Sequence, residues 1–171
     1  MPAMSRPALL TLLLLTALPA CKEQAGPAGP GDSGGGKVCT QIGCINGFRV
    51  ELKKATPWTP GVYSFAFELD GKPLECKGSL PLQGCDAGPS LSCTEDGKVQ
   101  IGESGCALPA DQQGFSDIQI SGEPQRVKLT ISLGDQPLHS AELTPSYTTS
   151  QPNGEGCGPI CRNAAGEIAV P

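Results

Sequence analysis

Cysteine is the residue type in this chain with the widest choice of chemistry. The 171-residue sequence contains nine cysteines. Cysteines bind zinc, exchange electrons in redox motifs or form structural disulfides, and their spacing helps to separate these roles. Four residues separate Cys39 from Cys44 and three separate Cys157 from Cys161, whereas zinc and redox motifs have the spacing C-x2-C. The spacing therefore favours disulfides over a metal site or a redox centre.

Eight of the nine cysteines are expected to form four disulfides, because Cys21 has a separate role described below. Eight cysteines allow 105 connectivities. From their order we expect the first two to bridge to the last two, which ties the ends of the domain together, and the middle four to pair with one another. A redox protein, the alternative, would need two accessible thiols among them. The expected disulfide cysteines are Cys39, Cys44, Cys76, Cys85, Cys93, Cys106, Cys157 and Cys161.

A serine nucleophile is suggested by residues 31–35, which read Gly-Asp-Ser-Gly-Gly. This segment resembles the nucleophile segment of trypsin-like serine proteases, in which the serine depends on a histidine base and a buried aspartate. No histidine precedes Ser33, and the only histidine, His139, lacks a matching context. We therefore interpret the segment as part of a linker. The sequence predicts no catalytic residue and no enzyme.

Metal and cofactor sites are not expected either. One histidine cannot supply a multi-histidine zinc site. The carboxylates Asp70, Glu95 and Asp96 stand at turn signals, outside any D-x-D-x-D-G run of the kind that binds calcium. We interpret them as turn formers.

Two aromatic residues in loops are candidates for contact with a partner. Trp58 stands between two prolines, and Tyr147 follows the last predicted strand. An exposed aromatic ring can stack on a glycan or on an envelope protein. The alternatives are that Trp58 covers one end of a β-sandwich and that Tyr147 makes a corner hydrogen bond.

The first 21 residues have the organisation of an export signal. Arg6 is the only charged residue before an eleven-residue apolar run, Ala8–Leu18, which is too short to span a bilayer core of roughly 30 Å. The run ends at Leu-Pro-Ala followed by Cys21. This end resembles the bacterial lipobox, in which an aliphatic residue and a small residue precede an invariant cysteine. The alternative is ordinary cleavage after Ala20, which gives a free secreted protein.

The lipobox resemblance implies that Cys21 becomes a lipidated N-terminus. Each buried methylene group contributes about 0.8 kcal/mol, so several acyl chains hold a protein firmly at a membrane. In bacterial lipoproteins an aspartate directly after the lipidated cysteine retains the protein in the inner membrane. This chain has Lys22 at that position, and the absence of aspartate points to the outer membrane. The expected localisation is therefore a lipid-anchored one in the cell envelope, outside the cytoplasm.

The charge of the mature chain excludes nucleic acid as the expected partner. Removal of residues 1–20, which contain Arg6 and no acidic residue, leaves 11 basic and 17 acidic residues, a net charge of −6. A nucleic-acid-binding protein needs a basic face. Residues 22–36 follow the lipidated cysteine and are rich in glycine, proline and alanine, a composition typical of a flexible tether.

Alternating apolar and polar residues predict a series of short strands after the tether. Asp70-Gly71 and Asp96-Gly97 are hairpin signals between them. From residue 145 we expect loop, with one helical turn over 159–165 that ends at Gly166. The expected strands cover residues 48–52, 63–69, 73–80, 91–95, 98–102, 115–120, 127–133 and 136–144.

These elements predict an all-β fold, an antiparallel immunoglobulin-like β-sandwich stabilised by disulfides, with a small β-barrel as the alternative. The expected organisation is a signal peptide at 1–20, a lipidated cysteine and tether at 21–36 and a β domain at 37–171. The Cys-rich, Gly/Pro-rich pattern of this body resembles the small lipoproteins of unassigned function that myxobacteria carry. We expect a non-enzymatic binding or structural module; the alternative is an envelope enzyme or redox protein.

Overall fold

The computed structural model describes residues 37–171, of which 38–171 form one compact unit. The predicted signal peptide, Cys21 and the segment around Ser33 lie outside the described residues. Within the described range, no helix is long and apolar enough to cross a membrane.

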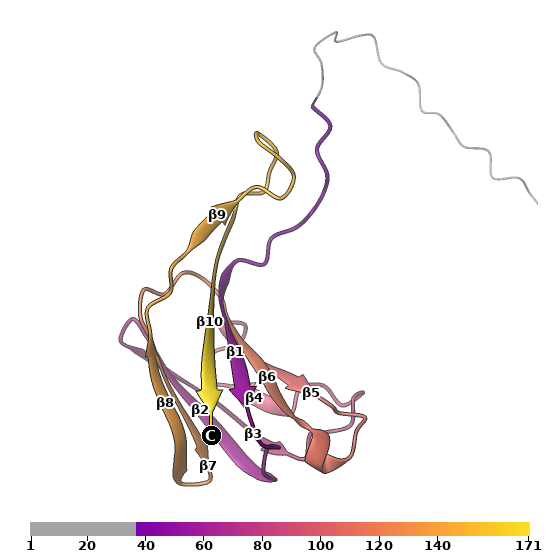
Figure 1. Ribbon diagram of the computed structural model, residues 1–171, viewed down its shortest axis with the longest axis vertical. Helices are drawn as coiled ribbons and strands as arrows, with labels where there is room; N and C mark the ends of the chain where they lie inside the picture. Colours follow the sequence, from indigo (N-terminus) through magenta and orange to yellow (C-terminus); the bar gives the residue numbers. More distant parts are fainter. Residues whose placement is uncertain (1–36) are drawn as a thin grey trace, which may run out of the picture. The chain divides into compact units, whose positions relative to one another are not determined.

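Residues 38–171 fold as two five-stranded sheets that pack face to face (Figure 1). Sheet A has the order β5-β6-β1-β10-β9, and sheet B has the order β4-β3-β2-β7-β8. The two sheets do not close into a barrel, so the predicted β-sandwich is confirmed. The strands are β1 (Gly47–Lys54), β2 (Gly61–Leu69), β3 (Lys72–Leu80), β4 (Leu91–Cys93), β5 (Val99–Ser104), β6 (Gly114–Ile120), β7 (Val127–Leu133), β8 (Gln136–Leu143), β9 (Thr148–Ser150) and β10 (Cys161–Val170), with one short 3-10 helix, η1 (Ala110–Gln112).

The core forms where the alternating apolar residues of the two sheets meet. In β1, Phe48, Val50 and Leu52 are buried, while Arg49 and Glu51 between them are exposed. The same period of two runs through β2 and β7, which pair along their lengths at the centre of sheet B. Successive side chains of a strand point to opposite faces, so this pattern buries one face of each sheet.

Strand β10 corrects the prediction for the end of the chain. Residues 159–165 do not form a helical turn, because β10 pairs with β1 from Gly47↔Asn163 to Lys54↔Val170. This pairing is parallel, so sheet A is mixed and the sandwich is not wholly antiparallel. The prediction of loop from residue 145 onward is also wrong, since β9 forms there and pairs with the start of β10. The small residues of β10 have weak strand preference, and the contact with β1 decides their conformation.

Trp58 is buried, as expected from the alternative in which it covers one end of the sandwich. Only 8 % of its surface is exposed. Its ring packs edge-to-face against Tyr63 and Phe115, with centroid distances of 5.4 Å and 5.0 Å. Gly114 lies so close to the indole that any side chain there would collide with it. Trp58 therefore covers the core at one end of the sandwich, which we call the plugged end.

The four disulfides connect the cysteines in the expected pattern. The first two cysteines bridge to the last two, as Cys39–Cys157 and Cys44–Cys161. The middle four pair with one another: Cys76–Cys93 and Cys85–Cys106. All eight predicted disulfide cysteines are therefore in bridges.

The two long bridges fasten residues 38–46 to residues 151–161, and we call these two segments together the clip. Figure 1 shows both segments beyond the same end of the sandwich, opposite the plugged end. The buried amide of Asn153 joins them: its Oδ1 accepts hydrogen bonds from Thr40 Oγ1 at 2.6 Å and Ile42 N at 2.8 Å, and its Nδ2 donates to the Ile42 carbonyl at 2.9 Å. A buried polar network of this kind holds one defined geometry.

Candidate functional site

The strongest candidate for a functional site is a pocket at the end of the sandwich opposite the plugged end, which we call the end pocket. Three connections surround it: the β2–β3 turn (70–71), the β4–β5 turn (94–98) and the β6–β7 link (121–126). The cavity has a volume of about 300 Å³. That value lies at the lower limit of ligand pockets in proteins, so the end pocket suits a small molecule.

Asp70 ties the β2–β3 turn to the β6–β7 link. It adopts a φ of 50°, in the left-handed region that aspartate tolerates better than most residues. Its Oδ1 accepts hydrogen bonds from the backbone N–H groups of Gln125 at 2.9 Å and Arg126 at 2.8 Å. Its own N–H donates to the Arg126 carbonyl at 3.0 Å. These three bonds fix one side of the end pocket.

Ser121 fixes the opposite side by tying the β6–β7 link to the β4–β5 turn. Its N–H donates to the Lys98 carbonyl at 2.9 Å, and its hydroxyl donates to the Gly97 carbonyl at 2.8 Å. Thr94, at the start of that turn, exchanges hydrogen bonds with Glu75 of β3. All three connections are therefore held in place by hydrogen bonds, and the end pocket is formed in advance of any ligand.

The end pocket has an apolar floor. Leu69, the last residue of β2, and Leu74, the third residue of β3, are 6 % and 5 % exposed and belong to the core. Pro124, in the link that joins β6 of sheet A to β7 of sheet B, is also buried and lines the cavity. These groups offer a surface for an apolar part of a ligand.

Two carboxylates at the rim already have partners. Asp70 accepts the backbone hydrogen bonds described above, and Glu123 pairs with Arg162 of β10, Nε to Oε2, at 2.9 Å. Their interactions leave them less free to bind a ligand cation.

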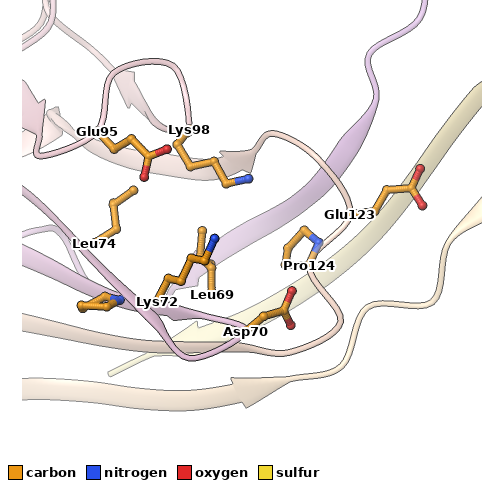
Figure 2. A pocket seen from close by; sticks show the side chains of 9 residues that line it. Leu69, Asp70, Lys72, Leu74, Glu95, Lys98, Glu123 and Pro124 are labelled. Atoms are coloured by element: carbon orange, nitrogen blue, oxygen red, sulfur yellow. The ribbon is translucent and has the colours of Figure 1, made fainter.

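Lys72, Lys98 and Glu95 are the charged groups of the end pocket whose side chains have neither an ion pair nor a hydrogen bond among the described residues. In Figure 2 both lysines direct their ammonium groups toward the side of Pro124, whereas the Glu95 carboxylate lies on the side of Leu74. Lys98 is half-buried, and a Cβ on Gly122 would lie 3.2 Å from its Nζ. The Asp70 carboxylate lies on the same side as the two ammonium groups, so the Pro124 side keeps an excess of one positive charge and the Leu74 side carries the negative charge of Glu95.

Tyr147 holds one of the residues that line the end pocket, Pro124, by a hydrogen bond. Its hydroxyl donates to the Pro124 carbonyl at 3.1 Å, which is the hydrogen bond anticipated as an alternative to partner contact. Burial raises the pKa of Tyr147, and the negative charges of Glu123 and Asp70 raise it further. The phenol is therefore neutral at physiological pH and acts as a donor. Its ring is half-buried and packs against the core.

A second cavity, of about 490 Å³, lies on the outer face of sheet A between β1, β6 and β10. Its only charged lining residue is Arg49, whose Nε pairs with Asp117 at 3.1 Å. This cavity offers small and polar side chains without a free charge. The end pocket, with its unpaired charges, is the better candidate.

The site residues considered in the sequence are only partly brought together. Asp70 and Glu95, interpreted as turn formers, line the end pocket, whereas His139 lies on β8 opposite Ile131 and does not. Lys72 and Lys98 were missed, although each stands within two residues of an Asp-Gly turn signal. Among residues 37–171, no group of three or more histidine, cysteine or acidic side chains could hold a metal ion. Comparison with protein families, curated proteins and solved structures found no match.

Proposed function

We propose that the protein is a lipid-anchored, non-enzymatic binding module of a bacterial cell envelope. The observation that carries this proposal is the end pocket, which three hydrogen-bonded connections hold open before a ligand arrives. Preorganisation of this kind favours binding because little conformational entropy is lost when the ligand enters. The four disulfides support export, since such bridges persist outside the reducing cytoplasm.

The surface of the clip supports an anchor at that end of the protein. Val38, Ile42, Ile45 and Ile160 are four of the six large apolar residues that are markedly exposed in the described chain. Val38 is 94 % exposed and stands shortly after the predicted tether. Exposed apolar groups gathered at one place mark a contact surface, and lipid held close by acyl chains on Cys21 would cover them.

The proposal is of binding and not of catalysis because the side chains that line the end pocket include no histidine, serine or cysteine to act as base or nucleophile. The lining residues are two lysines, acidic residues, leucines and prolines, and His139 is not among them. The size of the cavity further favours a small molecule over an envelope protein or a long glycan as the ligand of this site.

Mass spectrometry of the mature N-terminus tests the anchor. We expect Cys21 to carry a diacylglycerol group and the chain to fractionate with membranes. Cys21→Ser should move the protein to the soluble fraction. A mature chain cleaved after Ala20 with an unmodified Cys21 would contradict the proposal.

A further inference from the structure

We propose that the ligand of the end pocket is a small zwitterion with an apolar body, the chemistry of an α-amino acid such as leucine. This inference rests on the proposed function, because it names the ligand class of the same site. It draws on the charge balance of the pocket, the net charges of its two sides and the nature of its floor.

The charges of the end pocket balance. Lys72 and Lys98 are matched in number by Asp70 and Glu95, while Glu123 is neutralised by Arg162. A ligand with a net charge would place that charge beside a like charge of the pocket without a matching partner, which is unfavourable. A ligand that carries one charge of each sign satisfies both sides.

The two sides of the pocket also differ in net charge, because the Pro124 side holds two ammonium groups and the Asp70 carboxylate, whereas the Leu74 side holds the Glu95 carboxylate. Lys72 and Lys98 point toward the side of Pro124, and the carboxylate of Glu95 lies on the other side, beside Leu74 (Figure 2). Two ammonium groups suit a carboxylate, which has four lone-pair positions to accept their hydrogen bonds. Glu95 then accepts hydrogen bonds from the ammonium group of the ligand.

The floor selects an apolar side chain. Leu69 and Leu74 line the pocket with aliphatic carbons, and the cavity of about 300 Å³ has room for a side chain of a few carbons. Burial of each methylene group there contributes about 0.8 kcal/mol. An α-amino acid with an aliphatic side chain therefore matches all three parts of the pocket.

The test compares leucine with two probes that each lack one charge, 4-methylpentanoate and 3-methylbutylamine. The experiment uses the mature chain with Cys21→Ser. Two-dimensional NMR spectra of its backbone amides monitor the binding of each compound. We expect saturable shifts at Lys72, Leu74 and residues 95–98 with leucine, and affinities about tenfold lower for each single-charge probe, the effect of losing one charge-assisted hydrogen bond.

Variants assign the two sides of the ligand. Lys72→Gln with Lys98→Gln should lower the affinity for leucine at least about tenfold, and Glu95→Gln should narrow the difference between leucine and 4-methylpentanoate. Lys77→Gln is the matched control, since Lys77 pairs with Glu75 at 3.0 Å and does not line the pocket. It should leave binding unchanged.

Two outcomes would overturn the inference. One is the absence of saturable shifts with about 10 mM leucine, a concentration at which a millimolar ligand binds measurably. The other is equal binding of leucine and either single-charge probe. If a different small molecule saturates the same amides, the ligand class is wrong while the binding function stands; if Cys21 is not acylated, the anchor fails whatever leucine does.

Discussion

At the scale of single residues, Asp70 does more for the end pocket than its exposed position suggests. Its carboxylate holds two backbone N–H groups of the β6–β7 link, 55 and 56 residues away along the chain. A charged acceptor that satisfies two backbone donors is worth more than an ordinary surface hydrogen bond. Its turn must also adopt a positive φ at residue 70.

We expect Asp70→Ala to lower the free energy of unfolding by about 1–3 kcal/mol, because it leaves two donors without their acceptor and places alanine in a left-handed conformation. Urea denaturation measures the change. Asp135→Ala is the control, since Asp135 is an exposed turn residue of the β7–β8 hairpin whose side chain makes no hydrogen bond to another described residue. Equal losses for the two variants would contradict this account of Asp70.

The two tyrosines of the chain give a second prediction at this scale. Burial raises the pKa of both Tyr63 and Tyr147 above the ordinary value of 10.0. Below pH 10 both tyrosines are protonated in the folded and in the unfolded state, so ionisation of these phenols does not lower the free energy of unfolding. Above pH 10 the unfolded state loses protons first, and the free energy of unfolding falls as the pH rises toward the folded pKa values.

Absorbance at 295 nm follows this titration directly, because Tyr63 and Tyr147 are the only tyrosines. We expect the phenolate signal of the folded protein to appear at higher pH than that of the protein in urea. Tyr63→Phe should remove one of the two late-titrating groups. Coincident curves for the folded and unfolded protein would show that neither phenol is shielded.

At the scale of elements, strands with large apolar residues could be predicted from the sequence and strands with small ones could not. Strand β7 alternates Val127, Leu129 and Ile131 with polar residues, and its bounds were predicted correctly. Strand β10 places Ala164 and Gly166 at inward positions, so its period of two is weak until Ile168. Its parallel partner β1 lies far away in sequence, and no local signal reveals that pairing.

The end pocket escaped prediction for a related reason. The Asp-Gly pairs at 70–71 and 96–97 indicated turns, which the structure contains. Turn chemistry is local, whereas the meeting of both turns with the β6–β7 link depends on how two sheets stack. The sequence therefore predicted the fold class and which groups of cysteines pair with each other, but neither the individual bridges nor which turns would share one end of the sandwich.

The small residues of β10 have a packing role that can be tested. At Gly166 the strand lies close to the Phe48 ring, and a Cβ added at this position would lie 3.0 Å from Phe48 Cζ. Gly166→Val should therefore overpack the contact between β10 and β1 and lower the free energy of unfolding by about 1–3 kcal/mol. Ala165→Val, on the exposed face of the same strand, should change it by no more than about 0.5 kcal/mol. Urea denaturation of both variants checks the difference, and a larger loss at residue 165 would contradict the assigned faces.

At the scale of the whole molecule, the two long disulfides act on nearly the same loop. Cys39–Cys157 and Cys44–Cys161 join residues 118 and 117 positions apart. Once either bridge has formed, the other closes only a small ring of the clip, roughly ten residues. In the chain-entropy description, the first bridge stabilises by about 5 kcal/mol and the second by about 3 kcal/mol.

Removal of these bridges should therefore be non-additive. Cys39→Ser/Cys157→Ser and Cys44→Ser/Cys161→Ser should each lower the free energy of unfolding by about 3 kcal/mol, because the remaining bridge still closes the long loop. Removing both should cost about 8 kcal/mol, more than the sum of the single losses. As a control, loss of Cys85–Cys106 should add to loss of Cys39–Cys157 with little coupling, because its loop of sequence separation 21 is nested in the long loop and shortens it only slightly. Urea denaturation without reductant measures all of these values. If the two long bridges proved additive, the clip would owe its stability to contacts such as those of Asn153 and not to a loop that both bridges share.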